Sequence, residues 1–343
     1  NIFINLHRNI YFSFVFRMPK QVFLFAWLFA LTYNRQYFSF EGLVGNHGSS
    51  GPYWLLADLF LAGLLFIWAF EYFVMRRPQT PRGYNLFVWY LPYAVICAIT
   101  ALTAERPDWT LYELVRNIKV ALVLLYFRYN VREREWWLVV LAIGLAATAQ
   151  AGLGALEVAT GRTGVLCIIG LGDNMAAVPD MFKDESFYGW VRATATMAHP
   201  PNLASYLLIS IPLYASLFVA GRTLLIRLGA GMLAAIMIVG MACTLSRFPI
   251  VLMMLELLLL LLVLVLLREA PVKKAIGILI LGCFVISVTL IPLGNFIADR
   301  FERDFDRSVE FRLKEYNVSF AMFKDYPLLG VGLNNYTAHM MDY

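Results

Sequence analysis

The stretch IVLMMLELLLLLLVLVLL, residues 250–267, decides the fold class of this 343-residue chain. It is nearly continuous Val, Leu and Met, and it approaches the ~20 residues that a helix needs to cross a bilayer. The rest of the chain agrees, because 60% of all residues are hydrophobic and only 15% are charged. A soluble protein of this size needs a more polar surface. Since backbone groups in lipid must be satisfied internally, we predict an all-α polytopic membrane protein.

Eight further apolar stretches are predicted to span the membrane, which gives nine helices at about 14–33, 54–74, 84–103, 110–127, 136–158, 203–220, 225–244, 248–267 and 275–296. We expect a single membrane domain over residues 1–343, with long loops at 159–202 and 297–343. The four cysteines form no metal-binding or disulfide pattern. The net charge of +5 is spread between helices, so it does not indicate nucleic-acid binding.

The distribution of Lys and Arg predicts the orientation, because positive residues gather in cytoplasmic connections. Alternate connections are rich in them: Arg8, Arg17 and Lys20; Arg76, Arg77 and Arg82; Arg128, Arg132 and Arg134; Arg222 and Arg227; Arg268, Lys273 and Lys274. The short connections on the opposite side hold Arg35, Arg106 and Arg247. We therefore expect a cytoplasmic N-terminus, with both long loops on the outer side.

Two predicted helix starts on the outer face each have an arginine nearby. Asn202 is a plausible N-cap for a helix that starts at Leu203. Ser246 is a plausible N-cap for the later helix that also enters the membrane from the outer side. Arg192 precedes the first cap and Arg247 follows the second. Helix N-termini and guanidinium groups both favour anions, so this face is a candidate phosphate site. The alternative is two ordinary caps with arginines that reach toward the headgroups.

Charges inside predicted spans are costly and usually face a polar cavity. In LYELVRNIKVALVLLYF, residues 111–127, Glu113 can pair with Arg116, whereas Lys119 has no partner within this helix. These residues are expected to line an outer-leaflet cavity, and a structural ion pair is the alternative for the first two. Glu256 lies alone in its span, where a hydrogen bond to a neighbouring helix is favoured over proton transfer.

The last loop has its own apolar pattern. An amphipathic helix over residues 308–325 is predicted to lie at the outer membrane interface and to stop before Pro327. Arg312 projects from it. Steps of three and four residues join the members of its apolar face, which are Val309, Leu313, Tyr316, Phe320 and Phe323.

Three segments carry a family resemblance: RATATMAHPPNLASYLLISIPL (192–213), TLSRFPIVLMM (244–254) and RLKEYNVSFAMFKDYPLLGVGLNNY (312–336). In order, spacing and sidedness they resemble the bacterial O-antigen ligase and O-antigen/exopolysaccharide polymerase superfamily. The resemblance implies a fold similar to the C-type glycosyltransferases. It also implies a location in the bacterial inner membrane and an active periplasmic face.

The resemblance further implies a reaction. A glycan would pass from an undecaprenyl-diphosphate carrier to an acceptor, which is a lipid A core for a ligase and another glycan repeat for a polymerase. Neither a metal nor a cofactor is implied. Arg192, Arg247 and Arg312 match the arginines that hold the lipid diphosphate, and Arg116, Lys119 and His199 are counted as further substrate-binding candidates.

The chain departs from the family pattern at its end. The family carries a histidine well after the Gly-x-Gly turn, just before further spans. Here His339 follows Gly332 after only seven residues, and the sequence stops at Tyr343. We therefore expect a C-terminally truncated chain, in which His339 is the candidate catalytic base although it lies earlier than the family's histidine.

Two other function classes compete with glycan transfer. A secondary transporter or lipid-linked oligosaccharide flippase would use the charges within the spans, but the sequence shows no inverted repeat and its polar features gather on one face. A non-catalytic scaffold of an export complex is the second alternative.

Overall fold

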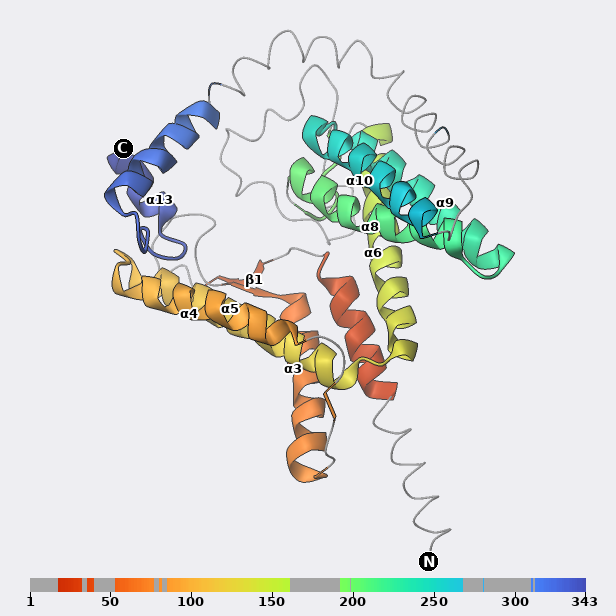
Figure 1. The fold of residues 1–343 in the computed structure, drawn as a ribbon, viewed down its shortest axis with the longest axis horizontal. Helices are drawn as coiled ribbons and strands as arrows, with labels where there is room; N and C mark the ends of the chain where they lie inside the picture. Colours follow the sequence, from red (N-terminus) through yellow and green to blue (C-terminus); the bar gives the residue numbers. More distant parts are fainter. Residues whose placement is uncertain are drawn as a thin grey trace, which may run out of the picture. The chain divides into compact units, whose positions relative to one another are not determined.

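The computed structural model describes residues 18–32, 36–39, 53–76, 80–81, 85–160, 192–197, 199–267, 280, 310 and 312–343. Helices make up most of this part of the chain (Figure 1). In chain order, the elements are the helix Met18–Ala30, β1 (Gln36–Ser39), β2 (Tyr53–Leu55), α3 (Leu56–Ala69), the π-helix Phe70–Val74, α4 (Leu86–Ile99), the 3₁₀ turn Thr100–Leu102, α5 (Pro107–Asn130), α6 (Glu133–Thr160), α8 (Pro200–Ala220), α9 (Leu224–Cys243), α10 (Arg247–Leu266), a helix over residues 312–325, α13 (Tyr336–His339) and the 3₁₀ turn Met340–Asp342.

The all-α polytopic fold class is confirmed. Five helices are long and apolar enough to cross a membrane: Leu56–Val74, Glu135–Thr160, Pro200–Ala220, Leu224–Cys243 and Phe248–Leu266. Two more predicted spans correspond to the shorter apolar helices Met18–Ala30 and Leu86–Leu102, and α5 covers the charged span 110–127. The ninth span, 275–296, lies outside the described residues. The total of nine spans, the likeness to C-type glycosyltransferases and the truncation stay predictions.

A small antiparallel sheet was not predicted. β1 pairs with β2, with Phe38 opposite Trp54. The second span was expected to begin at residue 54, but its helix begins at Leu56 because the residues before it pair as a strand.

The chain packs as two compact units. The first contains residues 1–24, 36–136 and 300–343, and the second contains residues 25–35 and 137–299. The single membrane domain expected over residues 1–343 stays a prediction.

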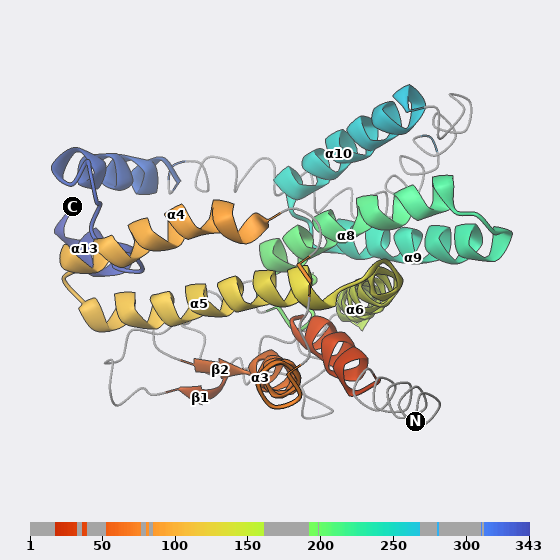
Figure 2. The same cartoon turned by 60° about the horizontal axis from the view of Figure 1, so that its bottom comes forward.

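In the first unit, α4 and α5 form an antiparallel hairpin (Figure 2). Pro107 occupies the first position of α5, where its missing N–H has no helical partner to lose. The Tyr90 hydroxyl of α4 donates a hydrogen bond of 2.6 Å to the Asn117 side-chain oxygen of α5. The hairpin therefore presents the turn at residues 100–106 as a defined surface.

In the second unit, α8 and α9 form another antiparallel pair, seen side by side in Figures 1 and 2. Small residues bring α6 close to α9, because a Cβ on Gly240 would lie only 2.5 Å from the Ala151 Cβ. Helices in lipid commonly pack through such residues. Large apolar side chains fill the space around this crossing, and the fully buried ones include Leu203, Leu207, Ile211, Met237 and Met241.

Candidate functional site

The segment of residues 192–197, just before α8, is held by a buried carboxylate of α6. Glu157 accepts hydrogen bonds from the backbone N–H groups of Thr194 and Ala195 at 2.8 and 2.9 Å. The residue is only 2% exposed. Hydrogen bonds to an ionised acceptor in a buried setting are strong. The segment therefore has a defined backbone although it forms neither helix nor strand.

A second side chain of α6, Gln150, lies two helical turns before Glu157 and holds the same segment. Its carbonyl oxygen accepts from the Thr196 N–H at 3.1 Å, and its amide group donates to the Thr32 hydroxyl at 3.1 Å. The Thr196 hydroxyl donates to the Thr32 carbonyl oxygen at 2.6 Å. These bonds tie three separate parts of the second unit together: α6, the segment before α8 and the end of the helix Met18–Ala30.

Arg192 lies against the N-terminus of α10. The Ala193 N–H donates to the Cys243 carbonyl oxygen at 3.0 Å, which aligns the segment with the end of α9. The Arg192 guanidinium then donates to the Thr244 carbonyl oxygen at 3.1 Å and to the Ser246 hydroxyl at 3.2 Å. Ser246 is the N-cap of α10, as predicted, and its hydroxyl serves the arginine instead of a helix N–H.

This arrangement concentrates positive charge at one helix end. Arg247 is the first residue of α10, directly after the Ser246 that Arg192 contacts. A helix N-terminus already carries a partial positive charge, so a guanidinium beside it raises the local potential further. Backbone N–H groups and guanidinium groups there suit the oxygens of a phosphate. The two arginines predicted at this face thus belong to one helix start: the Arg192 guanidinium contacts the N-cap, and Arg247 is the first helical residue.

Helix α8 begins earlier than predicted. His199 is the N-cap, with an extended backbone (φ −131°, ψ 139°), and Pro200 is the first helical residue. The predicted N-cap Asn202 is wrong: this residue lies inside the first turn, and its amide group donates to the Met197 carbonyl oxygen at 3.3 Å. Proline favours the first helical position because its φ is already helical. The substrate-binding role of His199 stays a prediction.

The charges within α5 have local partners in the first unit. Arg116 pairs with Glu113 at 2.9 Å, as the spacing predicted. Lys119 pairs with Asp58 of α3 at 2.8 Å, and the Asp58 side chain is only 9% exposed. This second pair accounts for a charge that the helix alone left unexplained. The roles of Arg116 and Lys119 in substrate binding stay predictions.

A tail of residues 326–343 closes on the turn between α4 and α5. The Leu333 N–H donates to the Thr100 hydroxyl at 3.2 Å, and the Thr110 hydroxyl donates to the Leu333 carbonyl oxygen at 2.9 Å. Gly332 has φ +94°, and a Cβ there would lie 2.6 Å from the Ala104 Cβ. The absence of a side chain at this position therefore allows both the backbone turn and the close approach.

Replacing Gly332 with alanine should loosen the tail. A Cβ would collide with Ala104 in a backbone region that disfavours L-residues, so we expect a loss of about 2–3 kcal/mol. Gly330→Ala is the matched control, because Gly330 also has a positive φ (+66°) but has no atoms within 4 Å of the new Cβ. Thermal melting and limited proteolysis of the detergent-purified variants measure the difference. Equal melting temperatures for the two variants would contradict the close approach.

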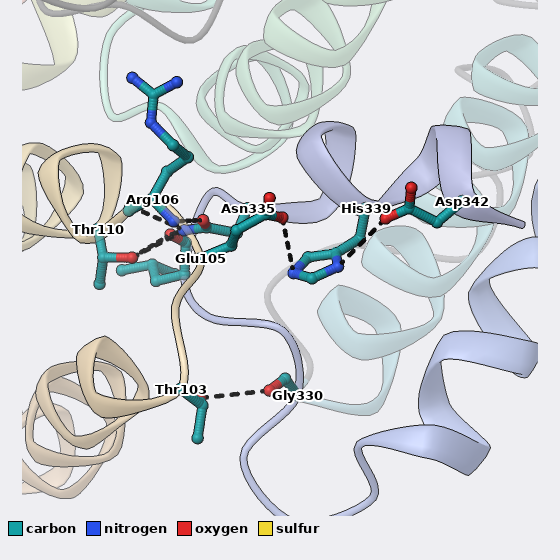
Figure 3. Close-up of polar contacts among 9 residues, drawn as sticks. Thr103, Glu105, Arg106, Thr110, Gly330, Asn335, His339 and Asp342 are labelled. Atoms are coloured by element: carbon teal, nitrogen blue, oxygen red, sulfur yellow. Dashed lines mark hydrogen bonds and ion pairs between the residues drawn. The ribbon is translucent and has the colours of Figure 1, made fainter.

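Asn335 is the central polar residue of the tail, and it is completely buried (Figure 3). Its side-chain oxygen accepts from the Arg106 N–H at 2.7 Å, and its amide group donates to the Thr110 hydroxyl at 2.9 Å. The same amide lies 3.3 Å from the Arg106 carbonyl oxygen. One side chain thereby contacts both backbone groups of Arg106 at the start of α5, where the carbonyl oxygen also accepts from the Trp109 N–H at 3.1 Å.

His339 stands at the end of α13 with a carboxylate near each ring nitrogen (Figure 3). Its Nε2 lies 3.4 Å from the Glu105 carboxylate, and its Nδ1 lies 3.8 Å from the Asp342 carboxylate. The imidazole side chain is 14% exposed. The Tyr326 ring packs beside it, with a centroid separation of 5.8 Å.

Arg106 and Asp108 form an ion pair at the turn between α4 and α5. The Arg106 guanidinium hydrogen-bonds both carboxylate oxygens of Asp108, at 3.2 and 3.0 Å, and holds the pKa of the Asp108 carboxyl below its usual range. The same hydrogen bonding raises the pKa of Arg106.

The remaining arginine of the predicted set, Arg312, is an exposed residue on the helix over 312–325. It belongs to the first unit, as do Arg116, Lys119 and His339, whereas Arg192, His199 and Arg247 belong to the second. The structure thus gathers the second-unit residues at the starts of α8 and α10. A site that combines them with Arg312 stays a prediction.

Four polar residues that hold these clusters were not among the predicted site residues: Gln150, Glu157, Glu105 and Asn335. Glu157 gave a signal in the sequence, because a carboxylate near the end of an apolar span needs a partner. Among the described residues, no three His, Cys, Asp or Glu side chains lie close enough together to hold a metal ion. Metal independence stays a prediction.

Residues 232–343 match the family model described as O-antigen ligase. The matched part begins within α9 and includes α10, the helix over 312–325 and the tail. Neither a curated protein nor a solved structure matches the chain.

Proposed function

We propose that the chain transfers a glycan from an undecaprenyl-diphosphate carrier to an acceptor hydroxyl, because residues 232–343 match the family model described as O-antigen ligase. The observation that carries the proposal is the contact of Arg192 with Ser246, which brings a second arginine to the helix start that bears Arg247. The donor's diphosphate is the dianionic group that such a helix start suits.

In the proposed reaction, the acceptor oxygen forms a bond with the anomeric carbon of the donor glycan. The bond between that carbon and the diphosphate oxygen breaks, and its electron pair leaves with the diphosphate. Arg192, Arg247 and the N–H groups of α10 stabilise the charge that develops on this leaving group. A single displacement inverts the anomeric configuration. His339 is the proposed general base for the acceptor hydroxyl.

The other predicted residues keep supporting roles. Arg312 is proposed to contact the carrier's diphosphate. His199, the N-cap of α8, is proposed to bind substrate beside the segment of residues 192–197. Arg116 and Lys119 are proposed to line the cavity through which the donor reaches the site. Their ion pairs with Glu113 and Asp58 keep these charges compensated inside the apolar layer.

The proposal places the chain in the bacterial inner membrane, with the N-terminus in the cytoplasm and the chemistry at the periplasmic face. The exposed aromatic side chains of the helix over 312–325 support an interfacial position for that helix. Tyr316, Phe320 and Phe323 are each at least 59% exposed, and the Lys324 ammonium lies 4.7 Å from the Phe320 ring centroid. Aromatic rings next to a lysine are typical of the headgroup region.

Reconstitution tests the proposal and separates its two forms. The full chain is placed in lipid vesicles with an undecaprenyl-diphosphate-linked oligosaccharide and either lipid A core or a second lipid-linked repeat. Glycan attached to lipid A core identifies a ligase, and longer chains on the carrier identify a polymerase. Absence of transfer to both acceptors refutes the proposal.

A transporter remains the second candidate because of one carboxylate. Glu256 lies within α10, and its Oε2 has no hydrogen-bond partner in the described part of the chain. Carboxylates embedded in a membrane often carry protons in transporters. Movement of the lipid-linked oligosaccharide across the vesicle membrane that depends on a proton gradient, without glycan transfer, would support this class.

A further inference from the structure

The contact between His339 and Glu105 joins two distant parts of the first unit. His339 belongs to the segment that matches the O-antigen ligase family, whereas Glu105 lies in the turn between α4 and α5, outside the match. The Nε2 atom of the imidazole lies 3.4 Å from a Glu105 carboxylate oxygen. No sequence pattern links the two residues, so only the fold brings them together.

Buried hydrogen bonds build both sides of this contact. On one side, the Asn335 carbonyl oxygen accepts from the His339 N–H at 3.3 Å and so begins the helical turn that presents the imidazole. On the other side, the Asn335 side chain binds the backbone of Arg106, which is the residue after Glu105. One buried residue therefore fixes the backbone at His339 and at Arg106, next to Glu105. The imidazole is 14% exposed and the Glu105 side chain 56%, so the carboxylate reaches the ring from the solvent side.

The two ring nitrogens of His339 have different surroundings. A carboxylate beside Nε2 favours the tautomer that carries its proton there, which leaves the lone pair on Nδ1. Nδ1 lies 3.8 Å from the Asp342 carboxylate, which is beyond hydrogen-bonding distance. The Tyr326 ring packs on the imidazole, and the Arg106 guanidinium of the same turn is engaged by Asp108.

We propose that Glu105 is a positioning residue for His339, which it holds in the tautomer that accepts a proton at Nδ1. The inference rests on the proposed function and adds a residue outside the family-matched segment. As the acceptor oxygen attacks, its proton passes to Nδ1. The Glu105 carboxylate stabilises the imidazolium that results, and the proton then leaves to solvent.

Glu105→Gln in the full chain tests the inference, with transfer measured on the reconstituted donor and acceptor. Loss of the negative charge should lower kcat about 10- to 100-fold, with little change in the KM for the donor. A merely structural role would instead lower the amount of folded protein and would not produce this split between kcat and KM.

Asp108→Asn is the matched control, because Asp108 is a carboxylate two residues from Arg106 that pairs with that arginine and does not contact His339. It should keep both the kcat and the KM for the donor. The pair His339→Gln and His339→Gln/Glu105→Gln should have equal rates, since the glutamate acts through the histidine.

The outcomes separate this inference from the proposed function. Transfer by the unmodified chain together with an unchanged kcat in Glu105→Gln would overturn the inference alone. An equal loss in Asp108→Asn would also overturn it, because the turn and not the carboxylate would then matter. Absence of transfer by the unmodified chain would overturn the proposed function itself.

Discussion

Replacing Arg192 with alanine is expected to lower glycan transfer about 10²–10³-fold, which is typical for the loss of one preorganised group that stabilises a developing negative charge. The guanidinium lies at the N-terminus of α10 through its bonds to Thr244 and Ser246. Without it, the proposed diphosphate site loses one of its two arginines. Transfer by the detergent-purified or reconstituted variant, normalised to the amount of folded protein, measures the effect.

A lysine variant and two controls sharpen this test. Arg192→Lys should fail nearly as badly, because an ammonium group does not reproduce the planar fork of a guanidinium. Ser246→Ala removes only the hydroxyl that receives the arginine, so a smaller loss is expected. Arg222→Ala, an exposed arginine of the turn between α8 and α9, should keep full activity. Wild-type transfer by Arg192→Ala would remove this residue from the proposed site.

Replacing Glu157 with alanine is the second change with a large expected effect. The backbone N–H groups of Thr194 and Ala195 would lose the carboxylate that accepts from them in a buried setting. A hydrogen bond to a charged group contributes about 1.5–3 kcal/mol, and an unsatisfied buried donor adds a desolvation cost. We expect a loss of about 3–5 kcal/mol in unfolding free energy, together with loss of transfer because Arg192 would no longer be anchored.

Thermal unfolding in detergent, followed by tryptophan fluorescence, measures this loss. Glu157→Gln keeps an acceptor oxygen but not the charge, so its melting temperature should lie between those of the wild type and the alanine variant. Glu133→Ala is the control within the same helix, because Glu133 is exposed in the first turn of α6. A melting temperature for Glu157→Ala equal to that of Glu133→Ala would show that the carboxylate does not hold the segment.

The sequence alone predicted features that depend on local patterns. The apolar run at residues 250–267 predicted a spanning helix because lipid allows few alternatives for so long a stretch. The sequence also predicted two N-caps, which give the exact residue at which a helix starts. Of these two predictions, the one at Ser246 was correct. The prediction at Asn202 was wrong because two prolines ahead of it already have a helical φ and extend the helix back to Pro200.

Contacts between distant residues were beyond the sequence patterns. Lys119 had no partner within α5, and neither spacing nor periodicity pointed to Asp58 of another helix. The same is true of Asn335 and Arg106, which meet only because the tail returns to the α4–α5 turn. Periodicity reports which face of one helix is apolar, but it does not report which other element covers that face.

The bond between Asn335 and Arg106 has a consequence for how the protein is made. The two residues are 229 positions apart, so the start of α5 leaves the ribosome long before its partner exists. At about 5–20 residues per second, the Arg106 N–H waits about 10 to 50 s for the asparagine that satisfies it. During that interval the contacts between the α4–α5 turn and the tail are missing. The first unit therefore reaches its final fold only after residue 335 has been synthesised.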